Sequence, residues 1–340
     1  GYFLIPQTTS SIDGQIILGG HIPFYPGHKD TAKRNGRAFP RMVHDGENWV
    51  ANLRVGFRGF ITASCGNWER YESWMNNEIT LAVDIWDYIL AVYSSTQMVN
   101  SMEHPNTCYL TNLPFPRSEE VFENMRSLGE FIRVLQSFEA LSNTSIYSQF
   151  YSSVSNFVGQ NIALRSSPDE SEGEVVELNQ FEIFGQKTDG RYTPRTRFQD
   201  AGEVDNNSIE DLELEFQNLS DILGLEQPEI HEDITKISAI RLNSGDVNTP
   251  QQWLHGVPRI ATNLVIGGHH ILRRWLTWNS NSGGRLHPTW NDEHRQNKYT
   301  ELIMLIRNLT SLGLIQPMAD SLFDDVIADL SSWHQFQNPN

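Results

Sequence analysis

The sequence has little cysteine and no long hydrophobic run. Its 340 residues include only Cys65 and Cys108, too few for a disulfide scaffold and without the paired spacing of a zinc site. No stretch offers the roughly 18 consecutive apolar residues of a membrane-spanning helix, and the N-terminus lacks the pattern of an export signal. We expect a cytoplasmic protein without membrane association. Because residue 1 is Gly rather than Met, we also expect a piece of a longer or processed chain.

Familiar catalytic and cofactor motifs are also missing. The chain has no Gly-x-Ser-x-Gly nucleophile motif, no Gly-Lys-Ser/Thr phosphate loop, and no Asp/Asn-Pro-Pro-aromatic tetrapeptide of amino-methylating enzymes. Adjacent histidines of a helix point about 100 degrees apart, and no Cys or Glu lies at a ligand spacing. The histidines concerned are His269, His270, His287 and His294. We therefore expect no metal site, no bound cofactor and no catalytic residue in this chain.

Positive charge is scarce overall, but the imbalance is local. The formal charge of −17 argues against a uniformly basic nucleic-acid-binding protein. Residues 165–236 carry nineteen acidic and six basic residues, a net charge of −13, so the rest of the chain carries only −4. Two stretches run the other way: residues 28–41 hold five basic residues and one acid, and residues 259–307 hold seven and three. A basic surface beside an acidic segment is compatible with this distribution.

Composition and periodicity divide the chain into three parts. Residues 1–142 start rich in Gly and Pro with short apolar runs and then become helical. Residues 143–236 are rich in Ser, Asn, Asp and Glu, and we interpret them as an acidic insertion. Residues 237–340 return to strand and helix patterns. We predict an α+β fold in which a β-rich N-terminal part is joined to a helical C-terminal part.

The spacing of apolar residues predicts individual elements. Alternation of Leu53, Val55 and Phe57 is typical of a strand, and residues 76–95 favour a helix opened by Asp84 or a nearby polar residue. Residues 118–141 favour the strongest helix, with Ser118 as N-cap and a buried stripe of Val121, Met125, Leu128, Ile132 and Leu135. Further expectations are a strand or strand pair at 174–185, an acidic helix at 208–225, a strand at 237–243, a turn or short helix at 249–258, and helices at 269–278 and 297–314.

The stretch NLVIGGHHILRRWLTW, residues 263–278, allows three interpretations: a phosphate-gripping loop, a metal site, or a glycine entry into a packed helix. Gly267 and Gly268 match neither a phosphate loop nor the three-glycine dinucleotide fingerprint. On a helical projection Ile271, Leu272, Trp275 and Leu276 share one face, opposite His270, Arg273, Arg274 and Thr277. We favour the packed helix, whose basic edge is a candidate for contact with a phosphate backbone.

The other basic stretch is an arm punctuated by Gly and Pro at residues 28–41. Such a loop is often only a solvated surface. The alternative is an arm that follows a phosphate backbone, from which Arg37 also reaches base edges. The basic side chains of the arm are Lys29, Lys33, Arg34, Arg37 and Arg41.

Three stretches, in this order, resemble one family. DIWDYILAVYSS (84–95), LPFPRSEEVFENMRSLGEFI (113–132) and WLHGVPRIATNLVIGGHHILRRWL (253–276) are similar to segments in the C-terminal part of type ISP-like restriction-modification enzymes. These enzymes are adenine-specific DNA methyltransferases fused or partnered to a nuclease. Gly256 and Pro258 belong to the Gly-Val-Pro turn of the third stretch, and Gly267, Gly268 and Trp275 to the helix entry that follows it.

The resemblance implies a target-recognition, or specificity, domain that positions double-stranded DNA for N6-adenine methylation. A separate domain or subunit would bind S-adenosylmethionine and carry out the methylation, in some cases with a nuclease attached. Candidate DNA contacts are Lys29, Lys33, Arg34, Arg37, Arg41, His270, Arg273 and Arg274. One alternative is a protein-interaction module of a phage-defence assembly that binds a partner through the acidic insertion. A further alternative is a hydrolase whose site the sequence does not reveal.

Overall fold

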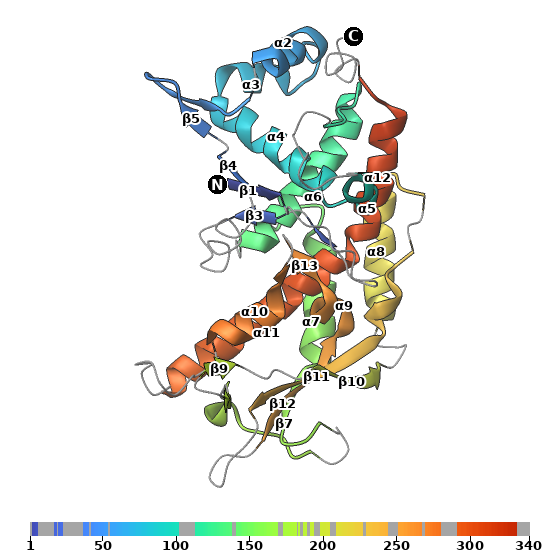
Figure 1. Ribbon diagram of the computed structural model, residues 1–340. Coiled ribbons are helices and arrows are strands. Elements are labelled where there is room, and N and C mark those ends of the chain that lie inside the picture. The colour runs from blue at the N-terminus through green and yellow to red at the C-terminus, as the bar shows by residue number, and fades with distance from the viewer. Residues whose placement is uncertain are drawn as a thin grey trace.

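The computed structural model of the chain contains many helices and several small sheets (Figure 1). It describes residues 2–5, 17–18, 20–22, 37–40, 42–53, 55–101, 113–137, 141–168, 173–181, 183, 186–188, 191–193, 198–204, 209–226, 229–243, 251–266, 269–279 and 291–331. This mixture of helix and strand agrees with the predicted mixed α and β class.

The largest described sheet has four antiparallel strands in the order β10-β11-β12-β7. A second sheet, β3-β1-β4, is antiparallel, and a third, β14-β13-β2, joins β2 to β13 in parallel. The pairs β5–β6 and β8–β9 are two-stranded. The strands are β1 Tyr2–Ile5, β2 Ile17–Leu18, β3 Gly20–Ile22, β4 Arg37–Pro40, β5 Met42–His44, β6 Trp49–Ala51, β7 Ala163–Arg165, β8 Gln186–Thr188, β9 Arg191–Thr193, β10 Phe198–Glu203, β11 Lys236–Asn243, β12 Gln252–Pro258, β13 Val265–Ile266 and β14 His269–His270.

Helices supply most of the core. In the orientation of Figure 1, α2, α3, α4 and α6 occupy the upper half, and the four-stranded sheet lies at the lower end. The α-helices are α2 Val55–Ser64, α3 Tyr71–Asn76, α4 Glu78–Val92, α5 Thr96–Ser101, α6 Glu119–Ser137, α7 Ser148–Asn161, α8 Glu210–Ile222, α9 Arg259–Asn263, α10 Ile271–Asn279, α11 Asp292–Leu314 and α12 Gln316–Ala328. Two short 3-10 helices are η3 Leu178–Gln180 and η5 Glu232–Ile234.

The N-terminal region is rich in strands as expected, but the strand predicted at residues 53–57 is wrong. The chain enters helix α2 at Val55. Phe57, Phe60 and Ile61 are buried there, the i, i+3, i+4 spacing of one helical face. The first two rings each pack edge-on against Phe115, with centroids 5.5 Å apart. The helix places these rings against Phe115, so the segment is helical despite its two-residue alternation.

Residues 252–258 form strand β12, so the turn or short helix expected at 249–258 is wrong. Every β12 residue is buried because the strand lies between β11 and β7. A strand buried on both faces lacks the alternation that identifies a half-exposed strand. The β11–β12 register shifts between Ser238 and Ile240, opposite Gly256, whose φ is 70°. Gly256 is the left-handed residue of this β-bulge, and a β-carbon there would also overlap the carbonyl of Asn161.

Helix α4 lies within the predicted range of residues 76–95, and Asn77 rather than Asp84 opens it. Asn77 caps it by accepting hydrogen bonds from the backbone N–H groups of Ile79 and Thr80. Asp84, considered as a cap from the sequence, lies inside the helix and is buried. Its carboxylate accepts hydrogen bonds from Arg70 at 2.9 Å and from the Trp74 indole at 2.8 Å. The acid is therefore a buried tertiary contact rather than a helix start.

Helix α6 confirms the predicted stripe and cap. Met125, Leu128, Ile132 and Leu135 are buried, and Val121 is half-buried. The hydroxyl of Ser118 accepts a hydrogen bond from the N–H of Val121 at 3.4 Å, in the N-cap position. The long apolar stripe holds α6 against α4 and α12, which explains why periodicity alone identified it.

The acidic segment is tied into the fold at both ends. Strand β7 pairs with β12 and β10 pairs with β11, so the segment supplies both edge strands of the four-stranded sheet. The acidic helix is present as α8, whose Leu212, Phe216 and Leu219 are buried. The strand expected at 174–185 is wrong: the described residues there hold η3 and one isolated bridge between Arg165 and Val175. The three-part division of the chain stays a prediction.

The stretch Asp292–Ala328, covering α11 and α12, is long and apolar enough by composition to cross a membrane. Within the structure 78% of its most apolar window is buried. Core helices of this kind pass the same test of length and hydropathy, so the stretch is weak evidence for a membrane span.

Candidate nucleic-acid interface

The basic arm connects β3 to β4, and the structure describes only its attachment points. Strand β4 begins at Arg37, whose backbone pairs with Ile5 of β1. The Arg37 side chain lies outside the described part of the structure, as do Lys29, Lys33, Arg34 and Arg41. The arm therefore starts and ends on the β3-β1-β4 sheet, and its contacts stay a prediction.

The second basic group lies where β14 leads into α10. His270 pairs with Val265 at the end of β14, and Arg273 and Arg274 occupy the first turn of α10. Leu272, Trp275 and Leu276 are buried while Arg273 is exposed, which confirms the predicted two-sided helix for these residues. His270 lies in strand β14, so the prediction that it belongs to the helix is wrong. Gly267 and Gly268 fall outside the described residues.

Arg273 is positioned by an aromatic ring. Its guanidinium carbon lies 4.4 Å from the centroid of the Phe198 ring on the edge strand β10. A cation–π contact orients the guanidinium without removing its charge. The four-stranded sheet thus holds a cation of α10 in place at the surface. A planar guanidinium of this kind suits bidentate contact with a phosphate or a guanine edge.

His270 adds little positive charge to this edge. Burial lowers the pKa of His270, and the neighbouring charge of Arg273 lowers it further. Since an unperturbed histidine titrates near 6.5, His270 is neutral at neutral pH. The cationic character of the edge therefore comes from the two arginines, and His270 is left as a hydrogen-bonding group.

The backbone topology brings the two basic groups onto adjoining sheets. Strand β2 pairs with β13 in parallel, Ile17 opposite Val265 and Leu18 opposite Ile266. Strand β3, from which the arm departs, begins at Gly20, immediately after β2. In Figure 1, β1, β3 and β4 lie above β13 and α10. Strands far apart in sequence, β2 and β13, are thus joined in one sheet, which sequence spacing does not reveal.

The remaining motif residues serve the fold. Gly256 forms the bulge of β12, and Pro258 ends that strand at the start of α9. Trp275 is buried, with the ammonium of Lys298 on α11 at 6.0 Å from its ring centroid. These residues join α9, α10 and α11 to the sheet. They position the basic edge but do not themselves present donors to DNA.

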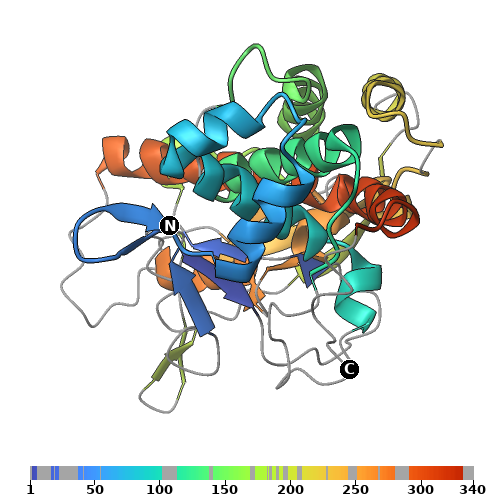
Figure 2. The same ribbon diagram turned by 90° about the horizontal axis from the view of Figure 1, so that it is seen from above.

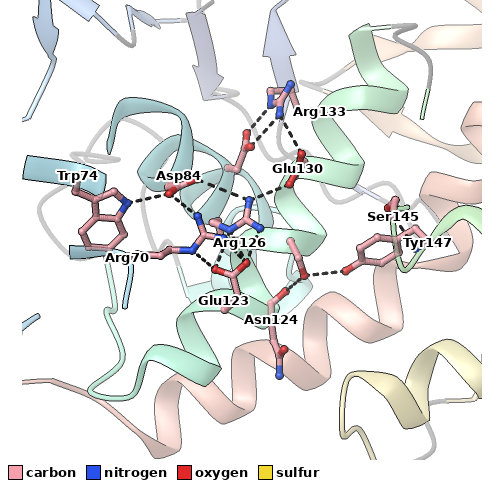
Figure 3. A network of polar contacts seen from close by, with 12 residues as sticks. Arg70, Trp74, Asp84, Glu123, Asn124, Arg126, Glu130, Arg133, Ser145 and Tyr147 are labelled. Atoms are coloured by element: carbon pink, nitrogen blue, oxygen red, sulfur yellow. Dashed lines mark hydrogen bonds and ion pairs between the residues drawn. The ribbon is translucent and has the colours of Figure 1, made fainter. Parts of the chain in front are cut away.

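A partly buried ion-pair network between the start of α3, α4 and α6 was not predicted (Figure 3). Arg70 pairs with both Asp84 and Glu123, and Arg126 pairs with Glu123 and with Glu130. The signal was a run of charges at intervals of three, four and three along α6: Glu123, Arg126, Glu130 and Arg133. Helical charges at this spacing usually mark a solvated face, so the pattern did not indicate that residues on α4 and at the start of α3 would pair with them.

Asp87 is the most buried acid of this region. It accepts hydrogen bonds from Arg133, with the Arg133 Nε at 2.7 Å and an Nη at 3.1 Å. Burial raises the pKa of Asp87 to about 6, and the Arg133 guanidinium opposes that rise. The paired geometry and the lack of exposure assign Asp87 to holding α4 on α6.

A cavity of about 410 Å³ lies beside Cys65 and Trp68. Its other lining residues are Ser64, Pro116, Arg117, Leu330 and Ser331. Burial raises the pKa of the Cys65 thiol to about 12, so the thiol is protonated and a poor nucleophile at neutral pH. Across the described ranges, no group of three or more His, Cys, Asp or Glu residues is arranged to hold a metal ion.

No protein-family model, curated protein or solved structure matches this chain.

Proposed function

We propose that the chain is the DNA-recognition module of an adenine-specific DNA methyltransferase or restriction-modification protein. The observation that carries this proposal is the exposed Arg273 at the start of α10, whose guanidinium carbon lies 4.4 Å from the centroid of the Phe198 ring. In both views α8 lies to the right, on the side away from β4 and from the N-terminal turns of α11 (Figure 1, Figure 2). Its exposed acids are Glu210, Asp211, Glu213 and Asp221.

This separation matters because charges on a protein surface act locally. At physiological salt, exposed charges more than about 8 Å apart are largely screened from one another. Any acid of α8 that lies farther than this from Arg273 does little to neutralise its charge. A net charge of −17 is compatible with a local edge that attracts phosphates.

The three family-like stretches support the same proposal through their packing. Gly129 of the second stretch lies directly against the backbone of Asp87 in the first. Gly256 of the third supplies the β12 bulge. Glycines of the resemblance thus occupy positions where the backbone needs them, as expected for a shared fold.

In this proposal the chain positions DNA and another polypeptide performs the chemistry. Its partners are double-stranded DNA and a methyltransferase domain or subunit, with a nuclease where one is attached. S-adenosylmethionine binds in that separate domain, and the methyl group is transferred to N6 of adenine there. The basic arm and the edge at residues 270–274 contact the duplex.

Duplex binding measured against salt concentration tests this proposal. A fluorescently labelled duplex is titrated with the full chain together with the methylating domain, and anisotropy reports binding. Phosphate contacts predict a linear fall of the logarithm of the association constant with the logarithm of salt concentration. Absence of binding at low salt would contradict the proposal.

A second candidate function is a protein-interaction module of a phage-defence assembly. It is favoured by one observation: α8 exposes Leu214 and Ile222, at 59% and 60%, among its acids. Apolar side chains on an acidic helix suit a partner with complementary basic and apolar surface. Exchanging Leu214 and Ile222 for Ser would weaken partner capture while leaving duplex binding intact under this alternative.

A further inference from the structure

We propose that Arg307 and Tyr299 of α11 form a binding site for a phosphate group, where α11 lies beside α7. The site is separate from the basic edge at residues 270–274. It rests on contacts within the described helices and stands whether or not the chain recognises DNA.

Arg307 is a half-buried cation without an anionic partner. Among the described residues its side chain makes no salt bridge and no hydrogen bond, and its Nε is buried without an acceptor. Other arginines of the core behave differently, because Arg126 and Arg133 each contact carboxylates. Leaving a buried charged donor unsatisfied is unfavourable. A bound anion would remove that unfavourable term.

A second donor, the hydroxyl of Tyr299, lies on the same helix eight residues before Arg307. Burial raises the pKa of Tyr299, and the positive charge of Arg307 opposes the rise, so the two groups are within electrostatic reach. The Tyr299 ring is fixed edge-on against Phe181, with centroids 5.4 Å apart. Its hydroxyl has no hydrogen-bond partner among the described residues and the side chain is half-buried. Arg307 and Tyr299 together present donors without an acceptor.

Neighbouring groups are fixed in a way that leaves these donors unused. The Tyr151 hydroxyl donates to the Asn308 side-chain oxygen at 2.8 Å, and the Asn308 amide donates to the Leu135 carbonyl at 2.9 Å. This chain of hydrogen bonds ties α6, α7 and α11 together. The Tyr151 hydroxyl is therefore already hydrogen-bonded and is not one of the proposed donors, although the charge of Arg307 also opposes the rise that burial causes in the pKa of Tyr151.

The site is open on its α7 side because of a glycine. Gly159 is exposed, and a β-carbon on it would come within 3.4 Å of an Nη of Arg307. A longer side chain at this position would lie over the guanidinium. The absence of a side chain leaves the cation reachable from solvent.

The donor set favours phosphate. A guanidinium offers several N–H groups in a plane, and a phosphate offers several oxygen acceptors with one or two negative charges. A phenol hydroxyl adds one more donor from another direction. Two sources carry this chemistry, a free phosphate ester and the backbone of a nucleic acid, and the experiment below separates them.

The probe is inorganic phosphate, titrated into the full chain at constant ionic strength while thermal unfolding is followed. We expect phosphate to raise the Tm of the wild type. Arg307→Gln should weaken the apparent affinity by about tenfold or more, as for loss of a hydrogen-bonded charge. Tyr299→Phe should weaken it by a smaller factor. The matched control is Arg117→Gln, because the Arg117 side chain is 69% exposed and pairs with Asp329; it should leave the affinity unchanged.

Gly159→Gln keeps Arg307 but places a side chain over its guanidinium. This variant tests the site even if Arg307→Gln does not fold. Loss of the phosphate effect in Gly159→Gln supports the site. The site is overturned if phosphate has no effect on the Tm of the wild type, or if it raises the Tm of both variants as much as that of the wild type.

Duplex binding by the same variants identifies the source of the phosphate. A reduced salt dependence in Arg307→Gln assigns the site to a nucleic-acid backbone, and unchanged duplex binding with lost phosphate binding assigns it to a free phosphate ester. Failure of DNA binding altogether would count against the proposed function and not against this site.

Discussion

Gly129 of α6 and Asp87 of α4 lie backbone against backbone, so close that a β-carbon on residue 129 would overlap the Asp87 carbonyl group. The two residues belong to different family-like stretches of the sequence. Their contact sets the separation of α4 and α6, and the Asp87–Arg133 pair is formed between the same two helices. The packing of α4 against α6 thus depends on the absence of a side chain at residue 129.

Gly129→Ala should destabilise the protein strongly. The added methyl meets backbone rather than a movable side chain, so α4 and α6 must separate, and overpacking of this kind costs about 3 kcal/mol or more. Chemical denaturation monitored by circular dichroism measures the change. Gly59→Ala in α2 is the control, because its β-carbon meets nothing within 4 Å. It should be neutral or stabilise by up to about 1 kcal/mol. Equal effects of the two substitutions would contradict the close approach.

Gly256→Ala should cost more than backbone strain alone. Gly256 has a φ of 70° and faces the Asn161 carbonyl, whereas Gly224 has a φ of 68° with nothing within 4 Å. Gly224→Ala therefore isolates the left-handed penalty, about 1–2 kcal/mol. Gly256→Ala adds steric overlap, and its free energy of unfolding should fall further than that of the Gly224 variant. The same loss in both proteins would show that Asn161 is not in contact.

Asp87 should give the protein a stability term that decreases as pH rises. Its folded pKa of about 6 lies above the ordinary aspartate value of 3.8, so the folded state binds the proton more tightly. The contribution is complete below about pH 4 and is lost as pH rises through 6, by on the order of 3 kcal/mol. The measurement is the free energy of unfolding of wild type and Asp87→Asn across pH 4 to 7.

The test is the difference in free energy of unfolding between wild type and Asp87→Asn at each pH. Glu78 and Glu123, whose pKa values are lowered by their arginine partners, titrate in both proteins and largely cancel. Relative to wild type, Asp87→Asn should gain stability as the pH rises from about 4 to 7. A difference that stays constant over this range would show that Asp87 keeps an ordinary pKa.

Elements with one buried face were predictable from the sequence. The stripe of α6, the acidic α8 and the two faces of α10 follow from periodicity because each helix has solvent on its other side. Strand β12 was missed because it is buried throughout, and α2 because its alternation over residues 53–57 also fits a helix.

The candidate site was only partly predictable. Arg273 and Arg274 stand out as adjacent charges on an apolar helix, so sequence alone identified them. The contact of Arg273 with Phe198 was not predictable, since it joins residues from distant strands and helices. Arg307 was hidden for a similar reason: the absence of a partner depends on the tertiary neighbours of α11.

The salt dependence of duplex binding by Arg273→Ala with Arg274→Ala tests the central claim most directly. Each lost phosphate contact lowers the slope by about 0.9, so the double variant should bind with a slope smaller by about 2 and with weaker affinity at low salt. Arg117→Ala, a change at an exposed arginine elsewhere, should behave as the wild type does. A double variant that binds the duplex with unchanged affinity and slope would contradict the assignment of this edge to DNA.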